Sequence, residues 1–218
     1  MKKAAVGFRV HSGWTALVAV ALEKGVPTVL RRQRVQLVET FSYKFRQPYH
    51  TAEKMRLEEA GKFISGVRTE AESLAYRSLH AVQVDLERQG YHLDRGGLLL
   101  ASGKPLPELE MILLSHALIH TADGELFREA LRGASARCGL RLTCTKEREL
   151  LEQCAEAFSL RPVELLRRVT ELGRPFGSPW SQDEKFATLA SWLVLDISQN
   201  AHPPQRATPA TPQARSRT

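Results

Sequence analysis

The chain has 218 residues, enough for one domain with a sizeable core, and its formal charge is +7. No apolar run reaches membrane-spanning length, and the apolar N-terminal stretch is too short for a signal peptide. The irregular spacing of Cys138, Cys144 and Cys154 excludes a zinc-finger pattern and implies no disulfide framework. We therefore expect a protein of the reducing cytoplasm with no membrane partner.

The first 38 residues predict three antiparallel strands. Residues 4–10 are almost wholly apolar, which indicates a strand covered on both faces and thus a central position in a sheet. A tight polar turn, His11-Ser12-Gly13, separates this strand from a second one over residues 15–22. A hairpin turn then leads to a third strand over 28–38. These connections are too short for parallel crossovers, so the three strands form a meander.

Helices and strands alternate in the rest of the chain. Periodic apolar residues predict a long helix over 51–89, and Ser181 with Glu184 forms a capping box for a last helix that ends near Asp196. The remaining predicted elements are a strand over 98–101, a helical region over 105–138, a strand over 140–145 and helices over 146–158 and 162–172. Residues 197–218 are rich in Pro, Ala and Thr, contain three arginines and no acid, and predict a disordered basic tail.

This order, β-β-β-α-β-α-β-α, resembles the ribonuclease H-like fold, which the actin-like ATPases share in elaborated form. The resemblance covers residues 4–196, and we expect residues 1–196 to form one α/β domain of three layers. It implies a five-strand mixed sheet with helices on both faces and with the first strand between the second and the fourth. Connectivity of this kind indicates a fold and leaves the function open.

The resemblance also implies where metal-binding carboxylates belong. Ribonuclease H-like nucleases hold two magnesium ions between carboxylates on the first strand, near the end of the fourth strand and on the last helix. In this sequence the first position is Arg9, the end of the fourth strand reads Ser102-Gly103-Lys104, and the resolvase-like register of the last helix puts Lys185 at the third. A shift of one helical turn would instead bring Asp183 or Glu184 inward. Cations at these positions favour an anion site over a metal site.

The first turn resembles the phosphate loop of actin-like ATPases only in part. From Arg9 to Gly13 it keeps the Ser-Gly pair and lacks the acid and the first glycine. The Ser12 hydroxyl and the backbone N–H groups of a tight turn can hold a phosphate without that acid. A plain β-turn explains the same residues.

The densest polar cluster lies in the helical region after the fourth strand. His116, His120, Gly124 and Arg128 recur every four residues and share one helical stripe. This pattern resembles a helix of bacterial proteins with no assigned activity. His-x-x-x-His spacing suits one metal ion, but the candidate third ligands, Asp123 and Glu125, could join the pair only if the chain folded elsewhere. We therefore expect anion binding or structural histidines and no metal. Trp14 and Trp180 flank the site positions and either stack on a base or cover the core.

We therefore predict a non-nuclease module that binds a phosphate-containing ligand, nucleic acid or a nucleotide, without a cofactor. The predicted ligand-binding residues are Arg9, His11, Ser12, His116, His120, Arg128 and Lys185. One alternative is a metal-dependent nuclease or phosphohydrolase of the resolvase type that uses Asp183, Glu184, Glu125 and the histidines. Another is a structural or protein-interaction domain that binds no small ligand.

Overall fold

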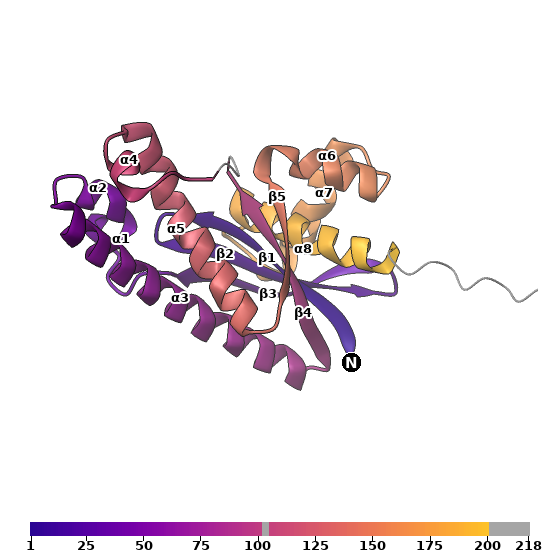
Figure 1. Cartoon of the computed structure of the whole chain (residues 1–218). Helices are drawn as coiled ribbons and strands as arrows, with labels where there is room; N and C mark the ends of the chain where they lie inside the picture. Colours follow the sequence, from indigo (N-terminus) through magenta and orange to yellow (C-terminus); the bar gives the residue numbers. More distant parts are fainter. Residues whose placement is uncertain (102–104, 201–218) are drawn as a thin grey trace, which may run out of the picture.

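A computed structural model describes residues 1–101 and 105–200 of the chain. Its centre is a five-strand sheet in the order β3-β2-β1-β4-β5, shown in Figure 1. β1 pairs antiparallel with β2 and parallel with β4, and β4 pairs parallel with β5, so the sheet is mixed and β1 is its central strand. The strands are β1 (Lys2–His11), β2 (Trp14–Glu23), β3 (Val26–Gln36), β4 (Tyr91–Leu100) and β5 (Arg141–Lys146).

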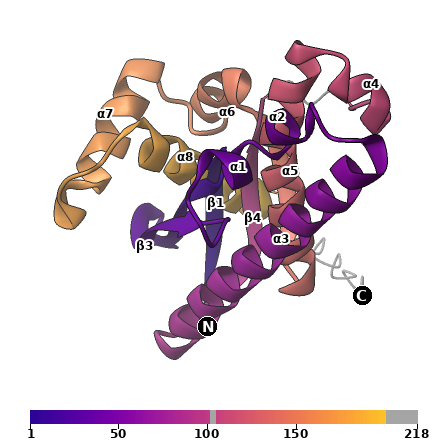
Figure 2. The same ribbon diagram turned by 90° about the vertical axis from the view of Figure 1, so that its left-hand side faces the viewer.

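Helices cover both faces of this sheet, as the two views in Figures 1 and 2 make plain. α3 and α5 lie on one face, and α8 crosses the other face over β1, β2 and β4, with α6 and α7 packed against it. The helices are α1 (Tyr43–Arg46), α2 (Pro48–Ala52), α3 (Leu57–Arg88), α4 (Leu109–Leu113), α5 (His116–Arg137), α6 (Leu150–Ala157), α7 (Pro162–Leu172) and α8 (Gln182–Asn200). Short 3-10 turns span Glu147–Glu149 and Arg174–Phe176.

The alternation of side chains along β1 explains why it needs cover on both faces. Val6 and Phe8 point into the core beneath α3 and α5, while Ala5 packs against α8. All three side chains are fully buried. The predicted ribonuclease H-like architecture, with the first strand between the second and the fourth, is therefore confirmed.

Several predicted boundaries are wrong, for local reasons. The long helix begins at Leu57 because Arg56 has an extended backbone, so residues 48–52 form the separate helix α2. β4 begins at Tyr91, seven residues before the predicted start, although its first half is polar. Asp94 there accepts hydrogen bonds from Arg95 and from Arg141 of β5, and this ion pairing compensates for the missing apolar side chains.

The C-terminal helix also differs from its prediction. α8 continues to Asn200, four residues beyond the predicted end at Asp196. The rest of the predicted tail, residues 201–218, lies outside the described residues, as do Ser102, Gly103 and Lys104. Cys138, Cys144 and Cys154 are free thiols, in agreement with the sequence. None of the helices in the described ranges has the length and apolarity needed to cross a bilayer.

Two glycines let α8 approach the sheet closely. Gly7 of β1 and Gly97 of β4 are partners in the strand pairing, and both face α8. A Cβ atom at Gly7 would stand 1.8 Å from the carbonyl oxygen of Ala187, and one at Gly97 would stand 2.5 Å from that of Ala190. Both distances are far below van der Waals contact, so any side chain at either position would push the helix away from the sheet. Ser191 anchors the seated helix by donating a hydrogen bond to the Ala5 carbonyl (2.8 Å).

We predict that Gly7→Ala destabilises the fold by about 3 kcal/mol or more, because the added methyl meets helix backbone that cannot move aside. Urea unfolding monitored by circular dichroism measures the loss. Gly66→Ala is the matched control, since Gly66 is exposed in α3 and a Cβ there meets no atom within 4 Å. The control should stabilise the chain by about 0.5–1 kcal/mol. Equal stability of the two variants would contradict the close seating of α8.

Candidate functional site

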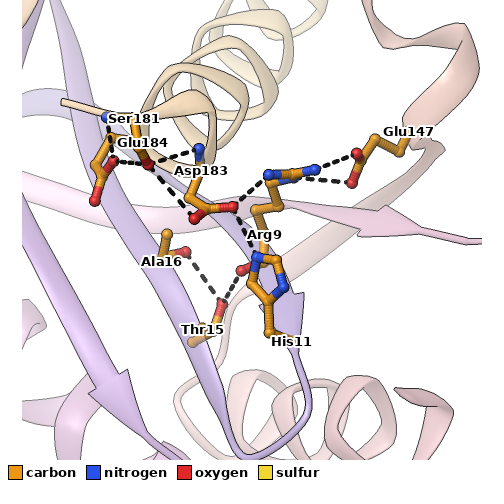
Figure 3. Close-up of polar contacts among 8 residues, drawn as sticks. All are labelled: Arg9, His11, Thr15, Ala16, Glu147, Ser181, Asp183 and Glu184. Atoms are coloured by element: carbon orange, nitrogen blue, oxygen red, sulfur yellow. Dashed lines mark hydrogen bonds and ion pairs between the residues drawn. The ribbon is translucent and has the colours of Figure 1, made fainter.

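Arg9 lies at the carboxyl end of β1 between two acidic side chains from distant parts of the chain (Figure 3). Its Nε and Nη2 donate to the two carboxylate oxygens of Glu147, at 3.0 and 2.6 Å, in a bidentate pair. Its Nη1 donates to Asp183 in the first turn of α8. The Arg9 side chain is only 15% exposed. The pKa of Arg9 is raised, mainly by the hydrogen bond with Glu147, and burial opposes this effect.

Asp183 is the acid of α8 that faces this site. The same oxygen that accepts from Arg9 also bonds Nε2 of His11 at 2.7 Å. Burial by itself would raise the pKa of Asp183, but the hydrogen bond with His11 and the charges of His11 and Arg9 outweigh it and lower that pKa. Asp183 is thus held as a carboxylate between two basic side chains.

Glu184, next to Asp183, caps the N-terminus of α8 and does not contact Arg9. Its carboxylate accepts hydrogen bonds from the backbone N–H (2.8 Å) and the hydroxyl (2.6 Å) of Ser181, while the N–H of Asp183 donates to the Ser181 hydroxyl (3.1 Å). The predicted capping box is therefore present at the start of α8. It fixes the first helical turn and thereby the direction of Asp183, as Figure 3 shows.

A cavity of about 500 Å³ adjoins the ion pair between Arg9 and Glu147. Its lining residues are Ala101, Arg128, Glu147, Arg148, Leu151 and Phe186. Arg128 of α5 lies over the end of β4, where its Nε donates to the Leu99 carbonyl at 3.2 Å. Burial lowers the pKa of Arg128, and the nearby charges of Glu125 and Glu147 oppose that effect. The cavity thus stands at the carboxyl ends of the parallel strands, where open α/β sheets bind ligands.

Basic and aromatic side chains surround the turn between β1 and β2. The ring of His11 stacks on Trp14, with centroids 4.4 Å apart, and the Arg34 guanidinium lies 3.8 Å from the centre of the Trp14 ring. Arg46 stacks on Phe41 at 4.3 Å. We call these five residues the hairpin-tip cluster. Within residues 1–101 and 105–200, neither Arg34 nor Arg46 is in an ion pair, and both Arg34 and Phe41 are exposed.

The structure divides the remaining predicted site residues among other places. Ser12 forms the hairpin turn, and its carbonyl accepts from Arg46 at 3.3 Å. Lys185 is half-buried on α8, and Asp183 rather than Lys185 bonds to Arg9. His116 and His120 gather around His50 of α2, and no contact among the described residues joins them to Arg9.

Three of the residues that complete these groups escaped the sequence analysis: Glu147, Arg34 and His50. Glu147 follows β5 directly, and this position at the carboxyl end of a predicted strand was the signal for it. Trp180 has a structural role, since its Nε1 donates to the Val169 carbonyl at 3.0 Å while its ring packs against Gly173.

We predict that Asp183→Asn destabilises the chain by about 1–3 kcal/mol at pH 7, because Arg9 and His11 lose a charged acceptor. The folded-state pKa of Asp183 is lowered, so its stabilisation is present above the ordinary value of 3.8 and disappears as pH falls through the lowered value. The difference from wild type should therefore shrink below about pH 4 in urea unfolding. Asp85→Asn is the control, because Asp85 is 42% exposed and lies 3.9 Å from Arg31. A loss no larger than that of the control would count against the Asp183 pairing.

Comparison with known proteins gives a match in structure only. No protein-family model matches the sequence, and no curated protein matches it in a sequence search. The structure of RuvC from Thermus thermophilus superposes with a TM-score of 0.53 at 10% identity, covering 91% of this chain and 96% of that one. The structure of T. thermophilus RuvC in complex with a Holliday junction substrate gives a TM-score of 0.54 with the same identity and coverage. The chain therefore has the ribonuclease H-like fold, as in RuvC.

Proposed function

We propose that this chain binds nucleic acid at the carboxyl edge of its central strands and does not cleave it by a two-metal mechanism. The solved structure of RuvC with a Holliday junction supports nucleic acid as the ligand class. The single observation that carries the second half of the proposal is the guanidinium of Arg9 between Asp183 and Glu147.

The residues at this place do not fit a pair of magnesium ions. Magnesium requires oxygen ligands in near-octahedral geometry. Here the position expected for the first carboxylate holds Arg9, and the two nearest carboxylates already bond to its cation. A divalent ion beside Arg9 would meet like charge at short range, which is costly in a partly buried place.

The other acids named for the nuclease alternative are also engaged. Glu184 caps α8 through Ser181. Glu125 pairs with Arg132 at 2.7 Å and lies 3.6 Å from Arg128. These contacts favour the binding module over the nuclease.

Phosphate binding is better assigned to the hairpin-tip cluster than to Arg9. The charge of Arg9 is neutralised by its two carboxylates. The guanidinium groups of Arg34 and Arg46 instead stack on the rings of Trp14 and Phe41, and their charge is available to a ligand. Exposed Phe41 adds a flat surface on which a base can stack. Among the originally predicted residues, His11 is part of this cluster, and Ser12 lies in the turn that it surrounds.

We predict salt-dependent binding that rests on the hairpin-tip cluster. The test uses the full chain with the tail arginines Arg206, Arg215 and Arg217 changed to Gln, so that the tail cannot bind phosphate non-specifically. Arg34→Gln combined with Arg46→Gln should weaken binding of single strands, duplexes and four-way junctions alike. It should also reduce the slope of log K against log salt by about 2, or about 1 for each lost phosphate contact. Fluorescence anisotropy measures both quantities.

Two further variants sharpen this test. Phe41→Ala should weaken single-strand binding by about 1–3 kcal/mol and leave duplex binding nearly unchanged, because only unpaired bases stack. Arg167→Gln is the matched control, since Arg167 is an exposed arginine of α7 paired with Glu164 and Glu171. A folded chain without affinity for any of these nucleic acids or for nucleotides at low salt would refute the proposal. The protein-interaction alternative would then be favoured.

We also predict that the chain leaves four-way junctions and RNA–DNA hybrids intact in millimolar Mg²⁺ or Mn²⁺. Gel electrophoresis of labelled substrates measures cleavage, with RuvC as the positive control. Cleavage that Asp183→Asn abolishes would revive the metal-dependent nuclease. Cleavage that this substitution leaves unchanged would point to a contaminating enzyme.

A further inference from the structure

Three histidines from two helices meet away from the Arg9 site. His50 lies on α2, and His116 and His120 lie one turn apart at the start of α5, which packs against α2. Their rings contact edge to face, with centroids 4.4 to 5.3 Å apart. The seven histidines of the chain are otherwise scattered along the sequence, so this gathering depends on the tertiary fold.

The ring nitrogens of these histidines have the spacing of metal ligands. Each histidine offers one nitrogen, and the three nitrogens lie within 4.8 Å of one another. The Nε2 atoms of His116 and His120 are 3.0 Å apart. Two nitrogens bound tetrahedrally to zinc at 2.0–2.1 Å would be separated by about 3.4 Å, so a small side-chain adjustment suffices.

A buried carboxylate orients the third histidine. Asp123 of α5, whose side chain is 3% exposed, bonds Nδ1 of His50 at 2.5 Å through one oxygen. Its other oxygen accepts from the backbone N–H of Tyr49 at 2.7 Å. With Nδ1–H directed at the carboxylate, His50 keeps Nε2 as its lone-pair nitrogen. Carboxylate–histidine–metal arrangements of this kind recur in protein zinc sites.

We infer that His50, His116 and His120 bind one divalent transition metal ion, with zinc as the best fit, and that Asp123 is the positioning residue behind His50. Three neutral imidazoles suit zinc, copper or nickel better than magnesium, which prefers oxygen ligands. His116 and His120 are exposed, so the fourth coordination position faces solvent and is open to water or an anionic ligand. The inference does not rest on the proposed nucleic acid binding, since none of the three histidines belongs to the hairpin-tip cluster. No metal was expected from the sequence, because Asp123 and Glu125 were the candidate third ligands and His50 of α2 was not considered.

Titration of the metal-free full chain with Co²⁺ and Zn²⁺ tests this inference. Optical absorption of Co²⁺ reports the geometry of its ligands, and isothermal titration calorimetry gives the stoichiometry and affinity for Zn²⁺. We expect one equivalent of Zn²⁺ and the intense visible bands of four-coordinate Co²⁺. His116→Ala and His120→Ala, both at exposed positions, should each weaken the site more than tenfold. Asp123→Asn should weaken it about 10–100-fold, the usual effect of losing such a positioning group.

Two matched variants distinguish this site from incidental binding. His92→Gln removes an exposed histidine outside the cluster, and Cys144→Ser removes an exposed thiol that itself attracts zinc. Both should bind Zn²⁺ as wild type does. Absence of stoichiometric binding, binding unchanged in His116→Ala and His120→Ala, or binding lost in Cys144→Ser would each overturn the inference. In that case the 3.0 Å contact between His116 and His120 is an ordinary hydrogen bond between two imidazoles.

Discussion

The position of α8 depends on the absence of side chains at two neighbouring points of the sheet. Gly7 and Gly97 let the backbone of α8 rest on β1 and β4 at a distance that no Cβ atom permits. Side chains on a strand alternate between faces, so Gly7 and Arg9 point to the same side, toward α8. The glycines therefore determine how near the first turn of α8 comes to the end of β1, and with it the contact between Asp183 and Arg9.

That contact determines the electrostatic character of the site. One guanidinium lies between two carboxylates, so Arg9, Asp183 and Glu147 together carry a formal charge of −1. Removal of one of these partners would leave a partly buried charge without compensation, which makes the three groups mutually dependent. In the proposed function, Arg9 neutralises these two acids in the place where a nuclease of this fold would hold a metal ion. In the proposed binding mode, an outside ligand instead meets Arg34 and Arg46 of the hairpin-tip cluster, which have no ion-pair partner within residues 1–101 and 105–200.

The strand order could be predicted from the sequence because it follows from local features of the chain. The tight turn at Ser12 and Gly13 forces β1 and β2 to be antiparallel neighbours, and the two-sided apolarity of β1 requires a central position. The first half of β4 escaped prediction because it is polar. Asp94 there pairs with Arg141 of β5, and only the folded chain brings these two residues together. Gly96 and Gly97 look like a loop signal in the sequence, yet both lie within β4, and Gly97 is one of the two glycines on which α8 packs.

The candidate site was harder to predict from the sequence than the architecture, because its residues also meet only in the folded chain. Arg9 and His11 could be singled out, because charged or polar side chains beside a buried strand need partners. Of their partners, Asp183 was named only as an alternative register of the last helix, and Glu147 was missed. Glu147 lies 138 residues and Asp183 174 residues from Arg9 along the chain, so the sequence could not show that they meet it. The histidine cluster shows the same limit. The spacing of His116 and His120 was visible in the sequence, whereas His50 reaches them only through the packing of α2 on α5.

The most direct test of this account is Mn²⁺ binding by wild type and by Arg9→Ser, each compared with a partner that also carries Asp183→Asn. Electron paramagnetic resonance counts free Mn²⁺, and the comparison within each pair removes binding at the histidines. The account predicts no Asp183-dependent Mn²⁺ binding in wild type and its appearance in Arg9→Ser, where the guanidinium no longer holds the two carboxylates. Binding of Mn²⁺ by the wild-type chain that Asp183→Asn abolishes would contradict the claim that Arg9 takes the place of a metal ion.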